Sequence, residues 1–208
     1  MKNRFNLPNF IMLAAAAFLL ASCASGPAVK ERAPDETQYD AAIEAMTLVI
    51  KENPLIAAAY NNRGNAWARK GEYKNAISDY TSAITLDPED PDTYMNRGSA
   101  YYDLADYDAA IDDYNRAVSL NPDSSGAYYN RANAYFYKKL YNRAVADYNA
   151  ALGLDPQNPR IHYGLGRANI QLRLPDRAIW DFKTSCSLAY EPACKEMDRL
   201  MGRDKLRR

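Results

Sequence analysis

Residues 91–124 read PDTYMNRGSAYYDLADYDAAIDDYNRAVSLNPDS, and the pattern of this stretch returns along the chain at intervals of 34 residues. Each interval holds a ring, a small residue, an alanine and a proline. These positions are Tyr60, Tyr94, Tyr128 and His162; Gly64, Gly98, Ala132 and Gly166; Ala76, Ala110, Ala144 and Ala178; and Pro54, Pro88, Pro122 and Pro156. A fixed period of this length indicates a protein built from stacked structural repeats.

Each interval has the apolar spacing of two helices. In residues 57–90 the two predicted apolar stripes, spaced by three and four positions, are Tyr60, Gly64 and Trp67, then Ala76, Tyr80 and Ala83. The second helix of each unit is predicted to stop just before Pro88, Pro122 and Pro156, because proline pushes the preceding residue out of the α region. We therefore expect these stripes to form the core.

The whole pattern resembles the tetratricopeptide repeat. The resemblance implies an all-α fold, a right-handed superhelix of antiparallel helix pairs whose concave face binds proteins. It covers residues 38–190, with a half repeat at 38–56, full repeats at 57–90, 91–124 and 125–158, and a divergent repeat at 159–190. Residues 191–208 are expected to form a capping helix and a basic tail, because the ends of a solenoid need atypical caps.

The first residues have a different organisation. Lys2 and Arg4 precede an apolar run from Phe10 to Ala21. A transmembrane helix needs roughly 20 apolar residues, so this run predicts a signal peptide at 1–22. The sequence LASC that ends at Cys23 resembles the lipobox of bacterial lipoproteins, which implies diacylglyceryl and palmitoyl chains on Cys23. An ordinary secreted protein with a chance cysteine is the alternative.

The segment after the lipobox is predicted to be a tether. Residues 23–37 contain Pro27 and Pro34 and show no apolar periodicity. In the lipoprotein family an aspartate after the lipidated cysteine retains the protein at the inner membrane, whereas this chain has Ala24. The resemblance therefore implies a lipid anchor in the outer membrane of a bacterial envelope, with the protein facing the periplasm.

Charge and motifs exclude several function classes. The 26 basic and 26 acidic residues balance, so nucleic acid is not an expected partner. His162 is the single histidine and falls at the ring position of a repeat, where packing is its expected role. The sequence shows no metal-ligand set, catalytic triad or glycine-rich phosphate loop. We predict no enzyme activity, no metal, no cofactor and no small-molecule substrate.

Asparagines recur at one position of three successive repeats. Asn62, Asn96 and Asn130 follow the ring position by two residues. By the resemblance this position faces the concave groove, where an amide donates to and accepts from a peptide backbone. The alternative is that the amides satisfy neighbouring polar groups of the protein itself. The series ends at Gly164.

Further residues are expected in the groove because aromatic rings are enriched at interaction surfaces. They are Met95, Tyr102, Tyr129, Phe136, Tyr137 and Tyr163. Some tetratricopeptide domains bind C-terminal carboxylates through lysines, but the corresponding positions here hold Asn61, Met95 and Tyr129. A carboxylate clamp is therefore not expected.

Arginines and aspartates also recur with the repeat. The arginines are Arg63, Arg97 and Arg131, and the aspartates are Asp79, Asp113, Asp147 and Asp181. We predict one structural ion pair per repeat. Leu165 interrupts the arginine series in the last repeat, which we expect to be more structural than ligand-binding.

Three cysteines are present, and one assigned to lipid leaves Cys186 and Cys194. Their spacing resembles the disulfide of cysteine-bearing helical repeats in exported bacterial proteins, which an oxidising compartment would allow. Two buried free thiols are the alternative.

The function indicated is that of a membrane-anchored adaptor without enzyme activity. We expect its groove to bind a segment or helix of an envelope protein, in the assembly of pilus, secretin or outer-membrane machinery or in the scaffolding of cell-wall enzymes. A subunit that contacts glycan or peptidoglycan in a polysaccharide system is the alternative, since aromatic and amide side chains also suit sugars.

Overall fold

The computed structural model describes residues 36–202. The predicted signal peptide, the lipidation site Cys23, nearly all of the predicted tether and the basic tail after residue 202 lie outside these residues.

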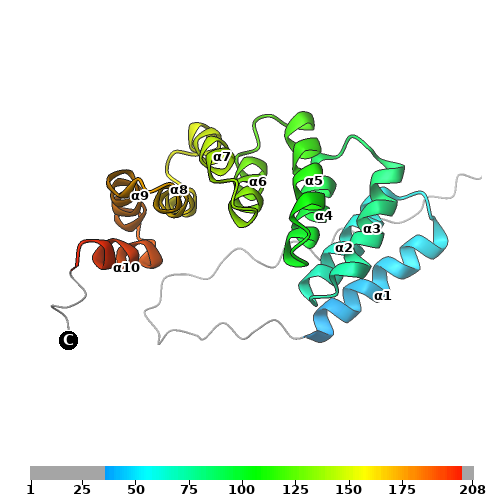
Figure 1. The fold of residues 1–208 in the computed structure, drawn as a ribbon. Coiled ribbons are helices and arrows are strands. Elements are labelled where there is room, and N and C mark those ends of the chain that lie inside the picture. The colour runs from blue at the N-terminus through cyan, green and yellow to red at the C-terminus, as the bar shows by residue number, and fades with distance from the viewer. Residues whose placement is uncertain (1–35, 203–208) are drawn as a thin grey trace, which may run out of the picture. The chain divides into compact units, whose positions relative to one another are not determined.

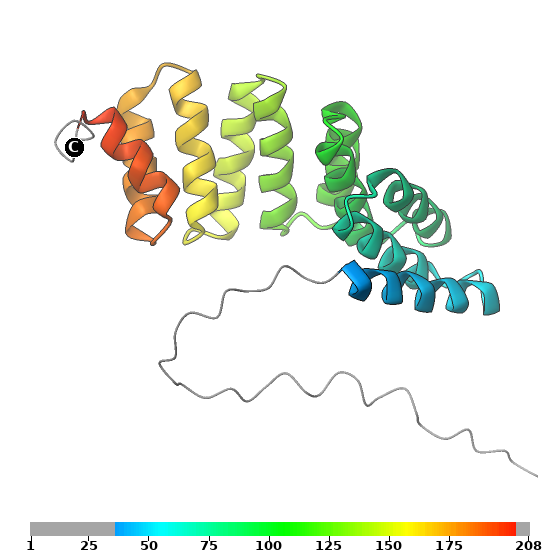
Figure 2. The ribbon, with the colours of Figure 1, turned by 90° about the horizontal axis from the view of Figure 1, so that it is seen from below.

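Residues 36–202 fold into ten α-helices and contain no strand (Figure 1). The helices are α1 (Glu36–Glu52), α2 (Ala57–Arg69), α3 (Tyr73–Leu86), α4 (Pro91–Asp103), α5 (Tyr107–Leu120), α6 (Ser125–Tyr137), α7 (Tyr141–Leu154), α8 (Pro159–Gln171), α9 (Pro175–Ser187) and α10 (Glu191–Leu200). Each helix packs on the next, and the views in Figures 1 and 2 show them following one another in chain order. The prediction of an all-α fold is confirmed.

Four helix pairs make up the repeats. We call α2, α4, α6 and α8 the first helices, and α3, α5, α7 and α9 the second helices. Each first helix also contacts the first helix of the next repeat, so the first helices form a continuous layer.

Local sequence determines where these helices begin. The side chains of Asp90, Ser124 and Asn158 each accept a hydrogen bond from a backbone N–H in the first turn of the helix that follows. Such a cap satisfies an N–H group that has no partner within the helix. Pro91 and Pro159 occupy the first turn, where a missing N–H costs nothing.

The second helices end as predicted. Asp87, Asn121 and Asp155 follow their last residues and leave the α region, with φ between −137° and −134°. Each of the three precedes a proline, which disfavours the helical conformation at that position.

A left-handed residue reverses the chain between the two helices of each pair. The φ angle is 77° at Gly71, 60° at Ala105, 62° at Lys139 and 61° at Arg173. Glycine adopts this conformation without a steric penalty, whereas a side chain adds strain. Three of the four repeats therefore keep this turn although a residue other than glycine adopts the left-handed conformation.

One large ring fills the centre of each pair. Tyr80, Tyr114, Tyr148 and Phe182 are each 1% exposed. A Cβ atom added to Gly64 would lie 2.7 Å from the ring of Tyr80, which is closer than carbon atoms pack. Small residues on the first helix therefore let the ring of the second helix lie directly against the backbone.

The rings of the first helices have a different role from the one predicted. Tyr60, Tyr94 and Tyr128 are only partly buried, so the expectation that Tyr60 belongs to the core is wrong. The guanidinium carbon of an arginine lies 5.4 to 5.8 Å from each ring centroid. These tyrosines cover a row of arginines. His162, the fourth member, is 6% exposed and is packed as predicted.

Candidate functional site

The layer of first helices carries two neighbouring pockets. The pocket of about 400 Å³ lies between α2 and α4 and is lined by Asn65, Arg69, Asn96, Ser99 and Asp103, with Tyr73, Tyr80, Ala68 and Ala100. The pocket of about 180 Å³ lies between α4 and α6 and is lined by Ser99, Tyr102, Asp103, Tyr114, Asn130 and Asn133. Because Ser99 and Asp103 line both pockets, the two form one surface, which we call the amide groove.

The predicted asparagine series contributes two of its three members to the amide groove. Asn96 lies in the larger pocket, where its Nδ2 donates to Oδ1 of Asn61 over 3.1 Å. Asn130 lies in the smaller pocket. Asn62 is exposed and lines neither of these two pockets, so its place in the groove stays a prediction.

The series ends at Gly164 for a steric reason. A Cβ atom at this position would lie 2.7 Å from the ring of Tyr148 and 2.9 Å from its hydroxyl oxygen. Such distances require the ring to move. Glycine is therefore the residue that this packing admits.

A second polar series in the groove was missed by the sequence analysis. Asn65 and Asn133 accept hydrogen bonds from the hydroxyls of Tyr80 and Tyr148 over 2.8 and 2.6 Å, and Ser99 lies 3.2 Å from the hydroxyl of Tyr114. The signal was present, since these residues follow the first series by three positions, which is one helical turn.

The same contacts explain the electrostatics of the groove floor. Burial raises the pKa of Tyr80, Tyr114 and Tyr148 far above the usual tyrosine range. Their hydroxyls therefore stay neutral and keep the polar partners in place. At the rim, the charge of Asp103 raises the pKa of Tyr73.

Aromatic side chains gather where the helices of the second and third repeats turn. Neighbouring ring centroids lie 5.4 to 5.7 Å apart. The members are Tyr102, Tyr107, Phe136, Tyr137 and Tyr141, which we call the aromatic cluster. Tyr137 is 47% exposed. The cluster brings together three predicted groove residues and adds Tyr107 and Tyr141, which lie on the second helices.

The other predicted groove residues lie apart from this cluster. The Tyr129 ring is 6.0 Å from that of Tyr148, and Met95 packs against the core of the second repeat. Tyr163 lies against Phe182 and Tyr190, with centroids 5.7 and 5.3 Å away.

A third pocket lies at the far end of the first-helix layer. It measures about 140 Å³ and is lined by Phe136, Tyr163, Arg167, Ile170, Gln171, Phe182, Glu196 and Arg199. The guanidinium carbon of Arg167 lies 4.4 Å from the Phe136 centroid and 5.8 Å from that of Tyr163. This arginine connects the aromatic cluster with the last repeat through cation–π contacts.

Comparison with known proteins identifies the architecture. A family model described as "Tetratricopeptide repeat" matches residues 91–124, and one described as "TPR repeat" matches residues 64–105 and 132–172. The first tetratricopeptide repeat (TPR) domain of Spaghetti (RPAP3), solved with the HSP90 peptide SRMEEVD, is 33% identical over 56% of this chain and 93% of its own, with a TM-score of 0.56.

The chain belongs to the tetratricopeptide repeat family.

Other solved structures agree with a TPR superhelix. A crystal structure of MamA is 26% identical over 76% of this chain and 92% of its own, with a TM-score of 0.70. YrrB, described as a TPR protein with an unusual peptide-binding site, is 18% identical over 78% and 84%, with a TM-score of 0.68. Curated protein sequences give no match.

The predicted arginine–aspartate pairs of the TPR array are confirmed in three repeats. Nε and Nη2 of Arg63, Arg97 and Arg131 donate to the two carboxylate oxygens of an aspartate over 2.7 to 2.8 Å. The hydrogen bonds that the guanidinium groups donate to these aspartates raise the pKa of each arginine. The third nitrogen, Nη1, donates to Thr47, Thr81 and Asn115 of the preceding second helix or its counterpart α1. The pairs therefore join consecutive repeats.

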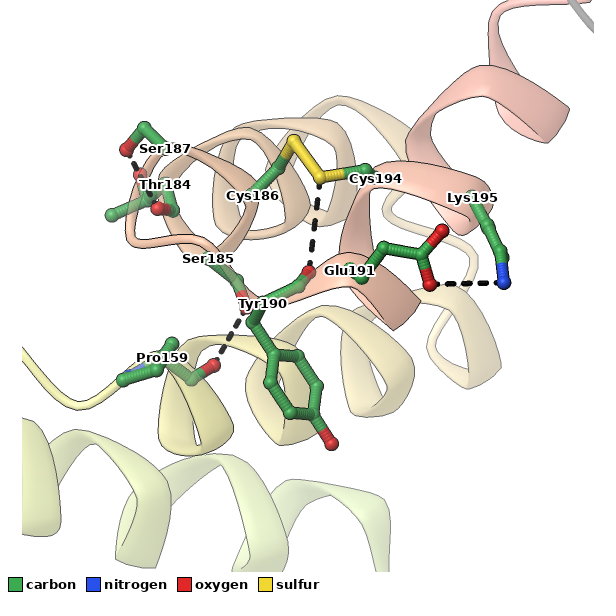
Figure 3. The surroundings of a disulfide bond; sticks show 9 residues. All are labelled: Pro159, Thr184, Ser185, Cys186, Ser187, Tyr190, Glu191, Cys194 and Lys195. Atoms are coloured by element: carbon green, nitrogen blue, oxygen red, sulfur yellow. Dashed lines mark hydrogen bonds and ion pairs between the residues drawn. A yellow bond between two sulfur atoms is a disulfide. The ribbon is translucent and has the colours of Figure 1, made fainter. Parts of the chain in front are cut away.

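A disulfide joins the last two helices. Cys186 on α9 and Cys194 on α10 are bonded across eight positions of sequence, and Sγ of Cys194 faces the carbonyl oxygen of Tyr190 (Figure 3). Figure 3 also shows Ser185, whose hydroxyl donates to the carbonyl of Pro159 over 2.7 Å and joins α9 to α8. The disulfide thus links the fourth repeat covalently to α10.

Two further kinds of site concern residues 36–202, a membrane span and a metal site. No helix in that range is both long and apolar enough to cross a membrane. The same range contains no group of three His, Cys, Asp or Glu side chains arranged to hold a metal ion.

Proposed function

We propose that this TPR protein is a lipid-anchored adaptor that binds an extended segment of an envelope protein along the amide groove. The observation that carries the proposal is the continuous row of amides and hydroxyls between α2 and α6. Asn96 and Asn130 present amide donors and acceptors there, and Ser99, whose hydroxyl donates to the carbonyl of Met95, presents an acceptor. Such groups suit the N–H and C=O groups of a backbone whatever its sequence. The groove would supply affinity, and the neighbouring rings would select side chains.

Two relatives support a peptide ligand. YrrB is described as having an unusual peptide-binding site, and the RPAP3 domain was solved with the peptide SRMEEVD. The lysines of a carboxylate clamp are absent from the present groove. Asn61 instead bonds Asn96, and Tyr129 packs on Tyr148. We therefore expect an internal segment of the partner rather than its C-terminus.

The aromatic cluster would anchor apolar side chains of the segment. Tyr137 is exposed over nearly half its surface, although Phe136 and Tyr107 hold its ring on two sides. A ring already fixed by its neighbours loses little conformational entropy on binding, which favours its use as an anchor.

The lipid anchor remains a proposal from the sequence. The LASC motif that ends at Cys23 supports lipidation, and Ala24 supports sorting to the outer membrane. Attachment there would confine the adaptor to one surface, where it would assist the assembly of pilus, secretin or outer-membrane machinery or scaffold cell-wall enzymes.

Photocross-linking in intact cells tests the groove. A photoreactive amino acid at Tyr137 should give a defined adduct, and the Asn96→Ala/Asn130→Ala double variant should reduce its yield at least about fivefold, because a lost hydrogen bond contributes about 1 kcal/mol. The matched control places the photoreactive residue at Asp112, which is exposed on second helix α5. Equal yields from Tyr137 in the parent and the double variant would refute the groove.

The aromatic cluster also favours the glycan alternative, because exposed rings and amides suit sugar faces. Retention of the chain on purified peptidoglycan, reduced by Tyr137→Ala, would support that function over peptide binding. For the anchor, Cys23→Ser should release the chain from the membrane without unfolding it, and continued tight attachment would contradict lipidation.

A further inference from the structure

A fourth pocket lies on other helices than those that form the groove. It measures about 240 Å³ and is lined by Val145 and Asn149 of α7, Leu165 and Asn169 of α8, and Arg177, Trp180 and Asp181 of α9. It shares no lining residue with the other three pockets described above. The pocket therefore falls between two second helices, α7 and α9, with the first helix α8 as its third wall.

The repeat period identifies the side chain that occupies the corresponding position in the earlier repeats. Leu165 lies 34 positions after Arg131. In the third repeat, the Arg131 guanidinium donates to both oxygens of Asp147 and to Oδ1 of Asn115 over 2.7 to 2.8 Å. The side chain of Leu165 has no such group and is shorter than that of arginine.

The acceptors of that arginine are still present in the fourth repeat. Asp181 and Asn149 lie 34 positions after Asp147 and Asn115, and both line the pocket. Asn169 donates to Oδ2 of Asp181 over 2.7 Å. Among residues 36–202, no hydrogen bond is directed to Oδ1 and no cation forms an ion pair with the carboxylate. The pocket thus retains the acceptor set of a guanidinium without its donor.

The Asp181 carboxylate lies in an environment that disfavours its charged form. Asp181 is 2% exposed, and burial raises its pKa to about 6. Arg177 lines the same pocket and partly offsets this effect with its charge, but its side chain is exposed and makes no ion pair with Asp181 in the described part of the chain. A buried carboxylate without a cation is costly, and an incoming cation would relieve that cost.

An aromatic wall completes the site. Trp180 is 61% exposed although it is the largest side chain of α9, and its ring lies 6.0 Å from that of His162. In the preceding repeat the Arg131 guanidinium lies 5.4 Å from the Tyr128 ring. An exposed tryptophan beside a buried carboxylate supplies the face over which a planar cation packs.

We propose that this pocket binds the arginine side chain of another polypeptide, whose guanidinium takes the place that Arg63, Arg97 and Arg131 fill in the earlier repeats. Arginine is favoured over lysine because the acceptors are placed for several N–H groups of one plane, and lysine offers a single charged centre. The site is independent of the proposed groove, so either could fail without the other.

The test uses the full chain in detergent micelles and acetyl-arginine-amide as the probe, with the neutral acetyl-citrulline-amide as its matched control. The Trp180 indole N–H signal should shift saturably with the arginine probe, and citrulline should bind at least about tenfold more weakly, since it lacks the charge. The chain has one other tryptophan, Trp67, whose signal serves as the internal control.

Two variants make the assignment specific. Asp181→Asn keeps the shape of the pocket and should weaken arginine binding at least about tenfold. Leu165→Arg supplies the guanidinium from within the chain and should abolish binding. Should Leu165→Arg fail to fold, the Asp181→Asn result decides alone. Equal shifts with both probes, unchanged binding by Asp181→Asn, or no saturable shift would overturn the proposal.

Discussion

The first three repeats and the fourth share a backbone design but differ in how they treat the same aspartate. In the first three, a guanidinium neutralises the carboxylate and joins the repeat to the helix before it. In the fourth, Asn169 gives Asp181 a single hydrogen bond and a pocket replaces the guanidinium. The difference teaches that Leu165 in place of an arginine, with Asn169 in place of an aromatic residue, changes a contact between repeats into an open pocket while the fold continues.

The fourth repeat also has contacts to its neighbouring helices that the earlier repeats lack. Ser185 bonds the carbonyl of Pro159, and the disulfide between Cys186 and Cys194 ties α9 to α10. These contacts stabilise the fourth repeat, which among residues 36–202 packs on α10 and not on a further helix pair.

The largest expected effect comes from making an early repeat like the fourth. Arg97→Leu should lower the free energy of unfolding by about 3 kcal/mol, because Asp113 would stay buried without a cation. Urea denaturation followed by circular dichroism measures the change. The double variant with Asp113→Asn should recover most of it. A single variant within about 0.5 kcal/mol of the parent would show that the pairs add little stability.

Opening the disulfide should have a somewhat smaller effect. Cys186→Ser with Cys194→Ser should cost about 2 kcal/mol, the amount expected when a short covalent loop is released from the unfolded chain. Thermal unfolding of the parent with and without reductant provides the comparison. A reductant effect that persists in the double variant would mean that its cause lies elsewhere.

Extending the asparagine series into the fourth repeat should also destabilise the fold. Gly164→Asn should cost about 1 to 3 kcal/mol, because the new side chain must displace the ring of Tyr148. The matched change, Asn130→Gly, should cost only about 0.5 to 1 kcal/mol through helix propensity. If calorimetry finds Gly164→Asn neutral, the ring moves freely and the steric explanation is wrong.

The smallest expected effect is that of Asp181→Asn on the free energy of unfolding, and this effect depends on pH. The pKa of Asp181 is raised from 3.8 to about 6 in the folded state, so the folded chain binds more protons than the unfolded chain between these values. The contribution of Asp181 to the free energy of unfolding is therefore lost as the pH rises through 6. Asp181→Asn should stabilise the chain by about 1 to 2 kcal/mol at pH 7, less than the full shift implies because the pocket admits solvent.

That gain should nearly vanish by about pH 3, where Asp181 is neutral in the folded chain and largely so in the unfolded one. Denaturation at both pH values, with Asp147→Asn as the control, gives the measurement. Asp147→Asn should instead destabilise the chain at pH 7, since it removes the partner of Arg131. A gain for Asp181→Asn that is equal at both pH values would exclude ionisation as the cause.

The sequence predicted most of the scaffold because repeats leave period-matched signals. Pro88, Pro122 and Pro156 indicated the ends of second helices, and the apolar stripes indicated the helix pairs. The pairing of Arg63 with Asp79 was also readable, since opposite charges recurred together.

The side-chain environment was less predictable. Tyr60 has the spacing of a core residue yet covers an arginine, and Asn62 has the spacing of a groove residue yet lies outside both pockets of the amide groove. The 34-residue period identifies only which residues of successive repeats occupy equivalent positions. Which face each residue takes depends on the twist between neighbouring helices, which is set by packing along the array.

The sequence by itself therefore determined the period, the helix pairs, their boundaries and the ion pairs, because local propensity and repeated spacing encode them. Only the tertiary structure decided that Asn65, Ser99 and Asn133 share the groove floor, that five rings form one cluster, and that the missing arginine leaves a pocket beside Asp181. These features arise between helices, where distance depends on how neighbouring repeats pack and not on the order of residues along the chain.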